Sequence, residues 1–285
     1  MNSRIRLLIC LLFISVKLFA VEPPSQGFLS LPDSQMPGPF FSFGQNIIGK
    51  NVLQFYFASG YQKLTTEQYL DIEPSLIYGI SENASIYLIA PVAIDYRDQE
   101  SHSSGFSDST IQLEYAFFNS SNAQGYGQAT IVGAVSFPTG SYNKSPPTGD
   151  GTSSLFLGTT YSFTGVNWYG FVSPGVELAS KRHDTLLGTQ YLYQLGVAKN
   201  IHSVSDHYIF AFMMEIDGEY DQKDKVMGVL DPDSGGNTIF ITPSLWYSTK
   251  KLILQLGISL PLVQQLNGDQ SKNQYFVVGS LGWTF

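Results

Sequence analysis

The chain has 285 residues, with 15 basic and 23 acidic side chains that give a formal net charge of −8 at pH 7. This acidic balance disfavours a nucleic-acid partner, because contacts to phosphate groups need a basic surface. The single cysteine excludes an internal disulfide, and the 17 Tyr and 20 Phe residues are a heavy aromatic content that the fold has to place.

The first twenty residues (1–20) have the layout of a secretory signal peptide. Arg4 and Arg6 precede an apolar run over residues 7–16, and Ala20 offers a small residue for cleavage. Cleavage there would remove Cys10, the only thiol, and would leave 12 basic and 23 acidic residues, a net charge of −11. Beyond the leader no run of eighteen apolar residues occurs, so we expect no membrane-spanning helix.

Residues 21–46 are rich in Pro, Gly and Ser and show no periodicity. We interpret them as an N-terminal arm. Two alternatives stay open for it: the arm either remains loose or folds into the mouth of the body formed by residues 47–285, where it would act as a plug.

The rest of the chain, residues 47–285, alternates apolar and polar side chains in short segments, which is the period of a β-strand. We count twelve such segments: 51–61, 68–80, 84–96, 106–118, 126–138, 152–163, 167–179, 188–199, 207–219, 237–248, 251–263 and 274–285. Pro74, Pro174 and Pro243 fall inside them, and because proline has no backbone donor we expect β-bulges there.

The connections between these segments alternate between short and long. Short connections such as 81–83, 164–166 and 249–250 take turns with longer polar ones, notably 139–151 and 220–236. Outer-membrane barrels have tight periplasmic turns and long external loops. The sequence therefore predicts an all-β fold: a closed, antiparallel transmembrane β-barrel of about twelve strands in the bacterial outer membrane, monomeric, with both termini in the periplasm.

The two faces of the segments differ as a barrel in lipid requires. Segment 251–263 places six aliphatic residues on one side (Leu252, Leu254, Leu256, Ile258, Leu260 and Leu262). Aromatic side chains at the membrane surfaces would form two girdles. The girdle near the short turns would comprise Tyr78, Phe117, Phe163, Trp168, Tyr208, Tyr247, Trp283 and Phe285. The outer girdle would comprise Tyr96, Phe137, Tyr191 and Tyr275.

The inward face predicts the candidate site, a set of pore-lining residues. They are Asp71, Glu73, Asp95, Glu114, Glu177, Glu215, Asp217 and Trp246, with Glu219 as a further acid. Two interpretations remain open for the acids: they hydrate the interior, or they favour cations over anions, as acidic rings do in channels. The inward aromatic residues either fill a narrow twelve-stranded lumen or provide a path for apolar solutes.

The last segment, Tyr275 to Phe285, ends on Trp283-Thr284-Phe285. This ending resembles the C-terminal strand of outer-membrane barrels, which closes the barrel against the first strand. The resemblance implies two partners, the lipid of the outer membrane and the barrel assembly machinery that reads the strand ending at Phe285.

A second resemblance lies in the middle of the chain. Gly105-Phe-Ser-Asp108 opens a segment that reads Ile111-Gln-Leu-Glu-Tyr115, and a Pro-Thr-Gly sequence ends the next segment at Gly140. These features resemble the outer-membrane family named for the meta-pathway of phenol degradation. The resemblance implies passive uptake of small solutes, including apolar or aromatic compounds. The alternative function is a non-conducting structural or adhesive barrel that acts through its external loops.

Catalysis is not expected. Lipid-cleaving barrels need a His and a Ser together on the lipid-facing wall, with a third residue to orient them. The four histidines (His102, His183, His202 and His207) all fall in or beside connections. No catalytic, metal or cofactor-binding motif was found, so we predict a protein that is not an enzyme and needs no cofactor.

Overall fold

The computed structural model describes residues 26–182 and 184–285. The predicted signal peptide, Cys10 and His183 lie outside this range. No helix of the described residues is long and apolar enough to span a membrane.

The wall of the molecule is built from twelve antiparallel strands, two of which are interrupted. They are β1 (Leu53–Leu64), β2 (Gln68–Ser81), β3 (Ala84–Ile89) continued by β4 (Val92–Arg97), β5 (His102–Phe106) continued by β6 (Ser109–Asn122), β7 (Gly125–Phe137), β8 (Ser154–Gly165), β9 (Trp168–Ala179), β11 (Gln190–Val204), β12 (Tyr208–Asp221), β15 (Gly236–Thr249), β16 (Leu252–Leu266) and β17 (Asn273–Thr284). The predicted segments are confirmed, with ends that differ by a few residues.

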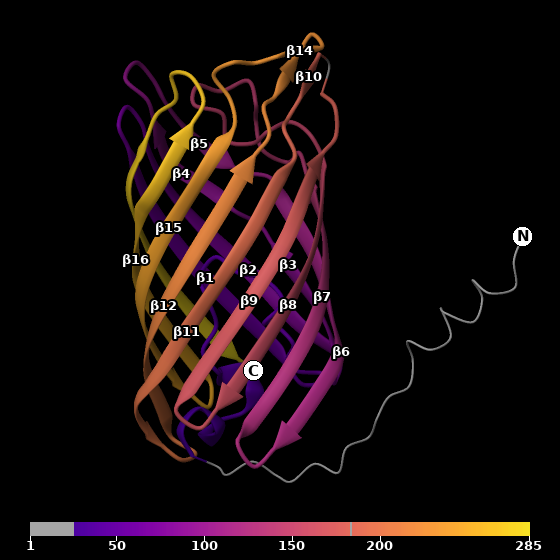
Figure 1. Ribbon diagram of the computed structural model, residues 1–285, viewed down its shortest axis with the longest axis vertical. Helices are drawn as coiled ribbons and strands as arrows, with labels where there is room; N and C mark the ends of the chain where they lie inside the picture. Colours follow the sequence, from indigo (N-terminus) through magenta and orange to yellow (C-terminus); the bar gives the residue numbers. More distant parts are fainter. Residues whose placement is uncertain (1–25, 183) are drawn as a thin grey trace, which may run out of the picture.

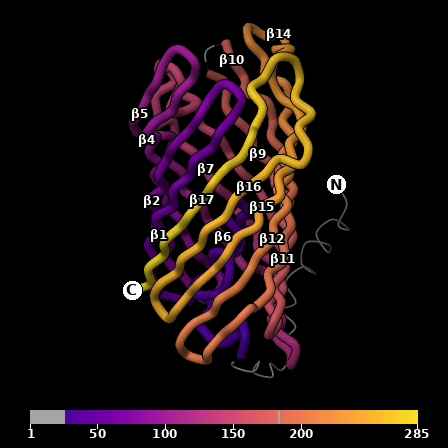
Figure 2. Tube along the Cα trace, turned by 90° about the vertical axis from the view of Figure 1, so that its left-hand side faces the viewer, coloured from indigo at the N-terminus to yellow at the C-terminus, as the bar shows by residue number. Residues whose placement is uncertain are grey.

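The first and last strands close the wall into a barrel. β1 pairs with β2 on one side and with β17 on the other, and Phe55 is the partner of Trp283 in the second ladder. Figure 2 shows β1 and β17 side by side along the length of the wall. Closure gives the backbone groups of both strands a ladder partner, which a strand needs inside lipid.

The short connections meet at one end of the barrel, the turn end, and the long ones at the other, the loop end (Figure 1). The turn end has connections of two or three residues, such as those between β2 and β3 and between β15 and β16. Above the rim of the loop end, β10 (Thr185–Leu186), β13 (Lys225–Val226) and β14 (Val229–Leu230) form a small separate sheet. By the rule for outer-membrane barrels, the loop end faces outward.

The outer face of the wall is apolar and the inner face is mixed. On β16, Leu254 and Leu256 are exposed by 41% and 62%, whereas Ile253 and Gln255, which alternate with them, are buried. The aliphatic residues that lie outside therefore contact lipid, since water would be an unfavourable neighbour for so large an apolar surface.

The three prolines interrupt a ladder without causing a bulge. Pro74 keeps its register with Phe57 of β1, and on its other side it faces the break between β3 and β4 at Ala90 and Pro91. Pro174 and Pro243 likewise keep register with one neighbouring strand and fall in a gap of the other ladder. The predicted bulges at these residues are thus wrong: a missing donor needs only an unpaired position, not an extra residue.

Candidate functional site

The N-terminal arm lies inside the barrel. It begins at the turn end with two short 3-10 helices, η2 (Gly27–Ser30) and η3 (Asp33–Gln35). The backbone N–H of Phe28 donates to the carbonyl of Val166 (2.8 Å), and the N–H of Asp206 donates to the carbonyl of Ser30 (3.0 Å). These two bonds attach the start of the arm to the turns after β8 and β11.

An apolar cluster anchors this part of the arm. Phe28 is fully buried and packs with Ile209, Met213 and Trp246 on the inner face of the wall. The neighbouring Gly27 has a φ of +61°, and a Cβ there would lie 1.7 Å from the Val166 carbonyl oxygen. Only a glycine can come so close to the Val166 carbonyl with this backbone conformation. The position of Phe28 therefore depends on Gly27.

Beyond the anchor, the arm follows the inside of the wall in strand order and forms hydrogen bonds with successive strands. The wall partners are Thr284 of β17 for Gln35, Gln255 of β16 for Gly38, Glu215 of β12 for Phe40, Gln194 of β11 for Phe41, Ser173 of β9 for Ser42, Thr160 of β8 for Phe43, Glu114 of β6 for Gly44 and Asn46, and Ser85 of β3 for Ile48. The arm therefore lies inside the lumen and is held by wall side chains, and Figure 1 shows this segment within the lower part of the barrel.

Two fully buried carboxylates hold the arm from different parts of the wall. Glu114 accepts from the backbone N–H of Gly44 (3.2 Å), from the backbone N–H of Asn46 (2.9 Å) and from the Asn46 side chain (2.8 Å). Glu215 accepts from the N–H of Phe40 through both oxygens, at 3.1 Å each. An arm without strand neighbours must find other acceptors for its buried N–H groups, and these two acids supply them.

Two cavities lie between the arm and the loop end. One, of about 350 Å³, is lined by Phe41, Gln194, Asp217, Phe240 and Phe276, among others. The other, of about 310 Å³, is lined among others by Phe40, Phe43, Glu73, Tyr87, Phe156 and Glu177. Phe41 and Leu192 contribute to both, so the two cavities adjoin. Aromatic rings and carboxylates form much of this space.

Two smaller cavities continue past the arm toward the turn end. Their volumes are about 120 and 80 Å³, and Asp33, Met36, Gln45 and Ile48 line both. The first also shares Glu73 and Tyr87 with the upper space. The four cavities therefore follow one another along the lumen, and the narrow part lies beside the arm.

Seven of the eight predicted pore-lining residues lie on the inner face. Glu114, Glu215 and Trp246 contact the arm, Glu73 and Glu177 line the upper space, and Asp217 lines the larger cavity. Asp71 is the cross-strand partner of Ala93, which is buried. The sequence pattern did not distinguish the acids that hold the arm from the acids that face open space.

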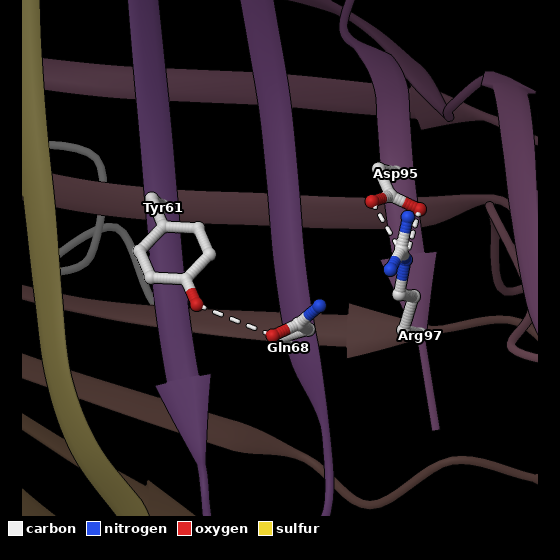
Figure 3. A network of polar contacts seen from close by, with 4 residues as sticks. All are labelled: Tyr61, Gln68, Asp95 and Arg97. Carbon is white, nitrogen blue, oxygen red and sulfur yellow. Dashed lines mark hydrogen bonds and ion pairs between the residues drawn. The ribbon is translucent and has the colours of Figure 1, made fainter. Parts of the chain in front are cut away.

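The position predicted for Asp95 is wrong. The ladder between β2 and β4 shifts by one residue, so that Asp95 is the partner of Leu70. Even-numbered residues of β2 point outward, and Figure 3 shows Asp95 beside the Tyr61–Gln68 pair on that side. Asp95 forms an ion pair with Arg97 there (2.8 Å). Because of the extra residue, the side chains that follow it point to the opposite face of the sheet from the one predicted.

The same bulge also moves Tyr96, which the sequence placed in the outer aromatic girdle. Tyr96 turns inward and packs edge-on against Tyr69, with ring centroids 4.8 Å apart.

In the connection that follows β4, the backbone N–H groups of Glu100 and Ser101 donate to the Asp98 carboxylate and lower its pKa.

The residues of the middle motif stabilise a loop and do not form a binding site. Asp108 accepts from the backbone N–H of Gly140 and of Asp150, at 2.8 Å each. A Cβ at Gly140 or Gly149 would lie within 3 Å of Asp108 Oδ1. The aspartate and the two glycines therefore fix the long connection after β7 beside the break between β5 and β6.

The wall is thin beside that break. A cavity of about 410 Å³ opens on the outer face and is lined mainly by apolar residues, including Phe55, Leu76 and Phe137. Ile89 and Thr110 line both this outer cavity and the smaller upper cavity of the lumen. The two spaces therefore adjoin the wall from opposite sides at these residues.

Among residues 26–182 and 184–285, no group of three or more His, Cys, Asp or Glu side chains is placed to hold a metal ion. Two of the described histidines have partners in the turn after β11. The Nδ1 atom of His202 lies 2.8 Å from the Tyr208 hydroxyl oxygen, and that of His207 lies 2.8 Å from the Ser205 carbonyl oxygen.

The closed wall and its apolar outer face define a bacterial outer-membrane β-barrel, with the N-terminal arm inside its lumen. The chain belongs to the family described as "Putative MetA-pathway of phenol degradation", whose model matches residues 38–283. The resemblance seen in the middle of the sequence is thereby confirmed, and the matched region includes the arm from Gly38 onward.

One solved structure has the same fold, and two others are more distantly similar. An outer-membrane channel from Pseudomonas putida F1 has a TM-score of 0.71 and 12% identity, over 88% of this chain and 100% of that chain. The β domain of the Bordetella autotransporter BrkA has a TM-score of 0.46 and 10% identity, over 82% and 99%. The monoaromatic hydrocarbon channel CymD has a TM-score of 0.41 and 11% identity, over 94% and 98%. No curated protein matches the chain.

Proposed function

We propose that this protein is a passive outer-membrane channel for small apolar or aromatic solutes. The observation that carries the proposal is the space between the arm and the loop end, where aromatic side chains line two adjoining cavities of about 350 and 310 Å³. Cavities of this size and lining are typical of sites for small organic molecules. A barrel that served only as a membrane anchor would have no use for them.

The family supports the same conclusion. Its description refers to phenol degradation, and the P. putida structure, which has the same fold, is described as an outer-membrane channel. A bacterium that degrades aromatic compounds must first bring them across the outer membrane. We therefore propose that the phenol degradation in the family description concerns the compound that is transported. It does not describe a reaction of this protein, which we propose is not an enzyme.

In this account a solute enters at the loop end and moves down its own gradient. Aromatic rings in the upper space replace its contacts with water, and the arm has to shift before the solute reaches the periplasm. The inward acids Asp71, Glu73, Glu177 and Asp217 line this route and disfavour anions.

Uptake by liposomes tests the proposal. Purified protein in liposomes is expected to speed the uptake of radiolabelled 2-phenylethanol several-fold over protein-free liposomes, while a disaccharide enters slowly because the arm narrows the lumen. Heat-denatured protein is the control. Equal uptake with native and denatured protein, for both solutes, would refute the proposal and favour the alternative of a structural or adhesive barrel.

A further inference from the structure

Two residues that line the larger upper cavity each have a buried acceptor oxygen without a donor. Gln194 of β11 and Asp217 of β12 are cross-strand partners, and their exposed fractions are only 6% and 7%. Thr242 donates to Asp217 Oδ2 (3.0 Å), and Gln194 Nε2 donates to the carbonyl of Phe41 (2.8 Å). The other oxygen of each side chain, Asp217 Oδ1 and Gln194 Oε1, has no hydrogen-bond partner among the described residues.

Such a pair of oxygens is a strong acceptor for a ligand. A buried acceptor without a donor is unfavourable, and the penalty is larger when the group carries a charge. No Lys, Arg or His belongs to the described lining of this cavity, whereas Glu219 adds a second carboxyl group to it. The group that complements the site is therefore a cation that can donate hydrogen bonds.

The remaining lining selects the rest of the ligand. Phe41, Phe240 and Phe276 face the same space, and the rings of Phe41 and Phe276 lie 5.3 Å apart between centroids. Aromatic faces attract ammonium groups and also bury an apolar body. A bare Ca²⁺ or Mg²⁺ ion would need six or more oxygen ligands close together, and among the described residues no group of three or more His, Cys, Asp or Glu side chains is placed to hold a metal ion.

We propose that this cavity is a binding site for organic ammonium compounds, in which a primary or secondary amine is attached to a small aromatic body. The ammonium group would donate to Asp217 Oδ1 and Gln194 Oε1, and the ring would lie among the three phenylalanines. The inference rests on the proposed function, because the cavity lies on the proposed route, and it adds a preference for cationic over neutral and anionic aromatic solutes.

Equilibrium binding of 2-phenylethylamine to the purified protein in detergent tests this site, with 2-phenylethanol and 3-phenylpropanoate as matched neutral and anionic probes. We expect the amine to bind at least about tenfold more tightly than the alcohol, since the charge-assisted contacts are absent for the latter. Asp217→Asn should weaken amine binding about tenfold and leave the alcohol unchanged. Asp95→Asn, the same change on the outer face of the wall, should leave both unchanged.

Three results would overturn the site: equal affinity of the wild type for the three probes, unchanged amine binding in Asp217→Asn, or equal losses in Asp217→Asn and Asp95→Asn. The first comparison needs no variant, so a folding defect in Asp217→Asn does not prevent a decision. Uptake by liposomes separates this inference from the proposed function. Alcohol uptake without amine preference refutes only the site, and amine binding without uptake of either probe refutes the channel.

Discussion

Replacing residues 38–46 with a Gly/Ser linker of equal length is expected to raise the single-channel conductance on the order of tenfold, because a twelve-stranded barrel without a plug encloses a continuous aqueous lumen. The linker removes the rings of Phe40, Phe41 and Phe43 and the hydrogen bond that the Asn46 side chain donates to Glu114. It keeps the anchor at Phe28, so the start of the arm retains its place at the turn end. Recordings in planar bilayers give the conductance directly.

The control for this variant is the same kind of replacement in the β13–β14 hairpin, residues 225–230, which lies above the rim at the loop end. That variant should keep the wild-type conductance. If the arm replacement and the hairpin replacement conduct alike, the arm is not the barrier in the lumen.

The second large effect is expected from the double substitution Glu114→Gln and Glu215→Gln. A glutamine keeps one acceptor oxygen and places an NH₂ group where the arm presents its own N–H donors. A buried hydrogen bond to a charged group contributes about 1.5–3 kcal/mol. Since about 1.4 kcal/mol changes a population tenfold, brief openings to the level of the linker variant should become at least about tenfold more frequent.

Single-channel recordings measure the frequency of these openings. Glu177→Gln is the matched control: it also removes one inward carboxylate, but the hydrogen bond that Glu177 accepts comes from Ser154 of β8 and not from the arm. Openings that are equally frequent in the wild type, the control and the double variant would show that the two carboxylates do not hold the arm.

The barrel could be predicted from sequence because its signals are local. The alternation of apolar and polar residues along a strand such as β16 indicates which face contacts lipid. The length of each connection indicates at which end of the barrel it lies. The breaks at Pro74, Pro174 and Pro243 could not be predicted in the same way. A proline shows that a donor is missing, but only the paired strands show whether the ladder leaves a gap or inserts a residue.

The candidate site was less accessible to sequence reasoning. One extra residue near Ile94 turns Asp95 outward and Tyr96 inward, and a single insertion leaves no trace in composition or period. The path of the arm could not be predicted either. Its backbone forms hydrogen bonds with wall side chains and not with a neighbouring strand, so its sequence does not need to alternate apolar and polar residues. For the same reason nothing in the sequence separates Glu114, which holds the arm, from Asp217, which faces a cavity.

A reversible lock on the arm tests the central claim, that solutes pass through the lumen only when the arm moves. The hydroxyl oxygens of Ser42 on the arm and Ser173 on β9 lie 2.7 Å apart, so cysteines at these two positions are close enough to form a disulfide. With Ser173→Cys alone as the control, uptake of 2-phenylethanol into liposomes should fall about tenfold when the double-cysteine protein is oxidised, because passage then requires an arm that cannot leave its bound state, and it should recover with a reductant. Equal uptake by the oxidised and reduced forms would contradict this account.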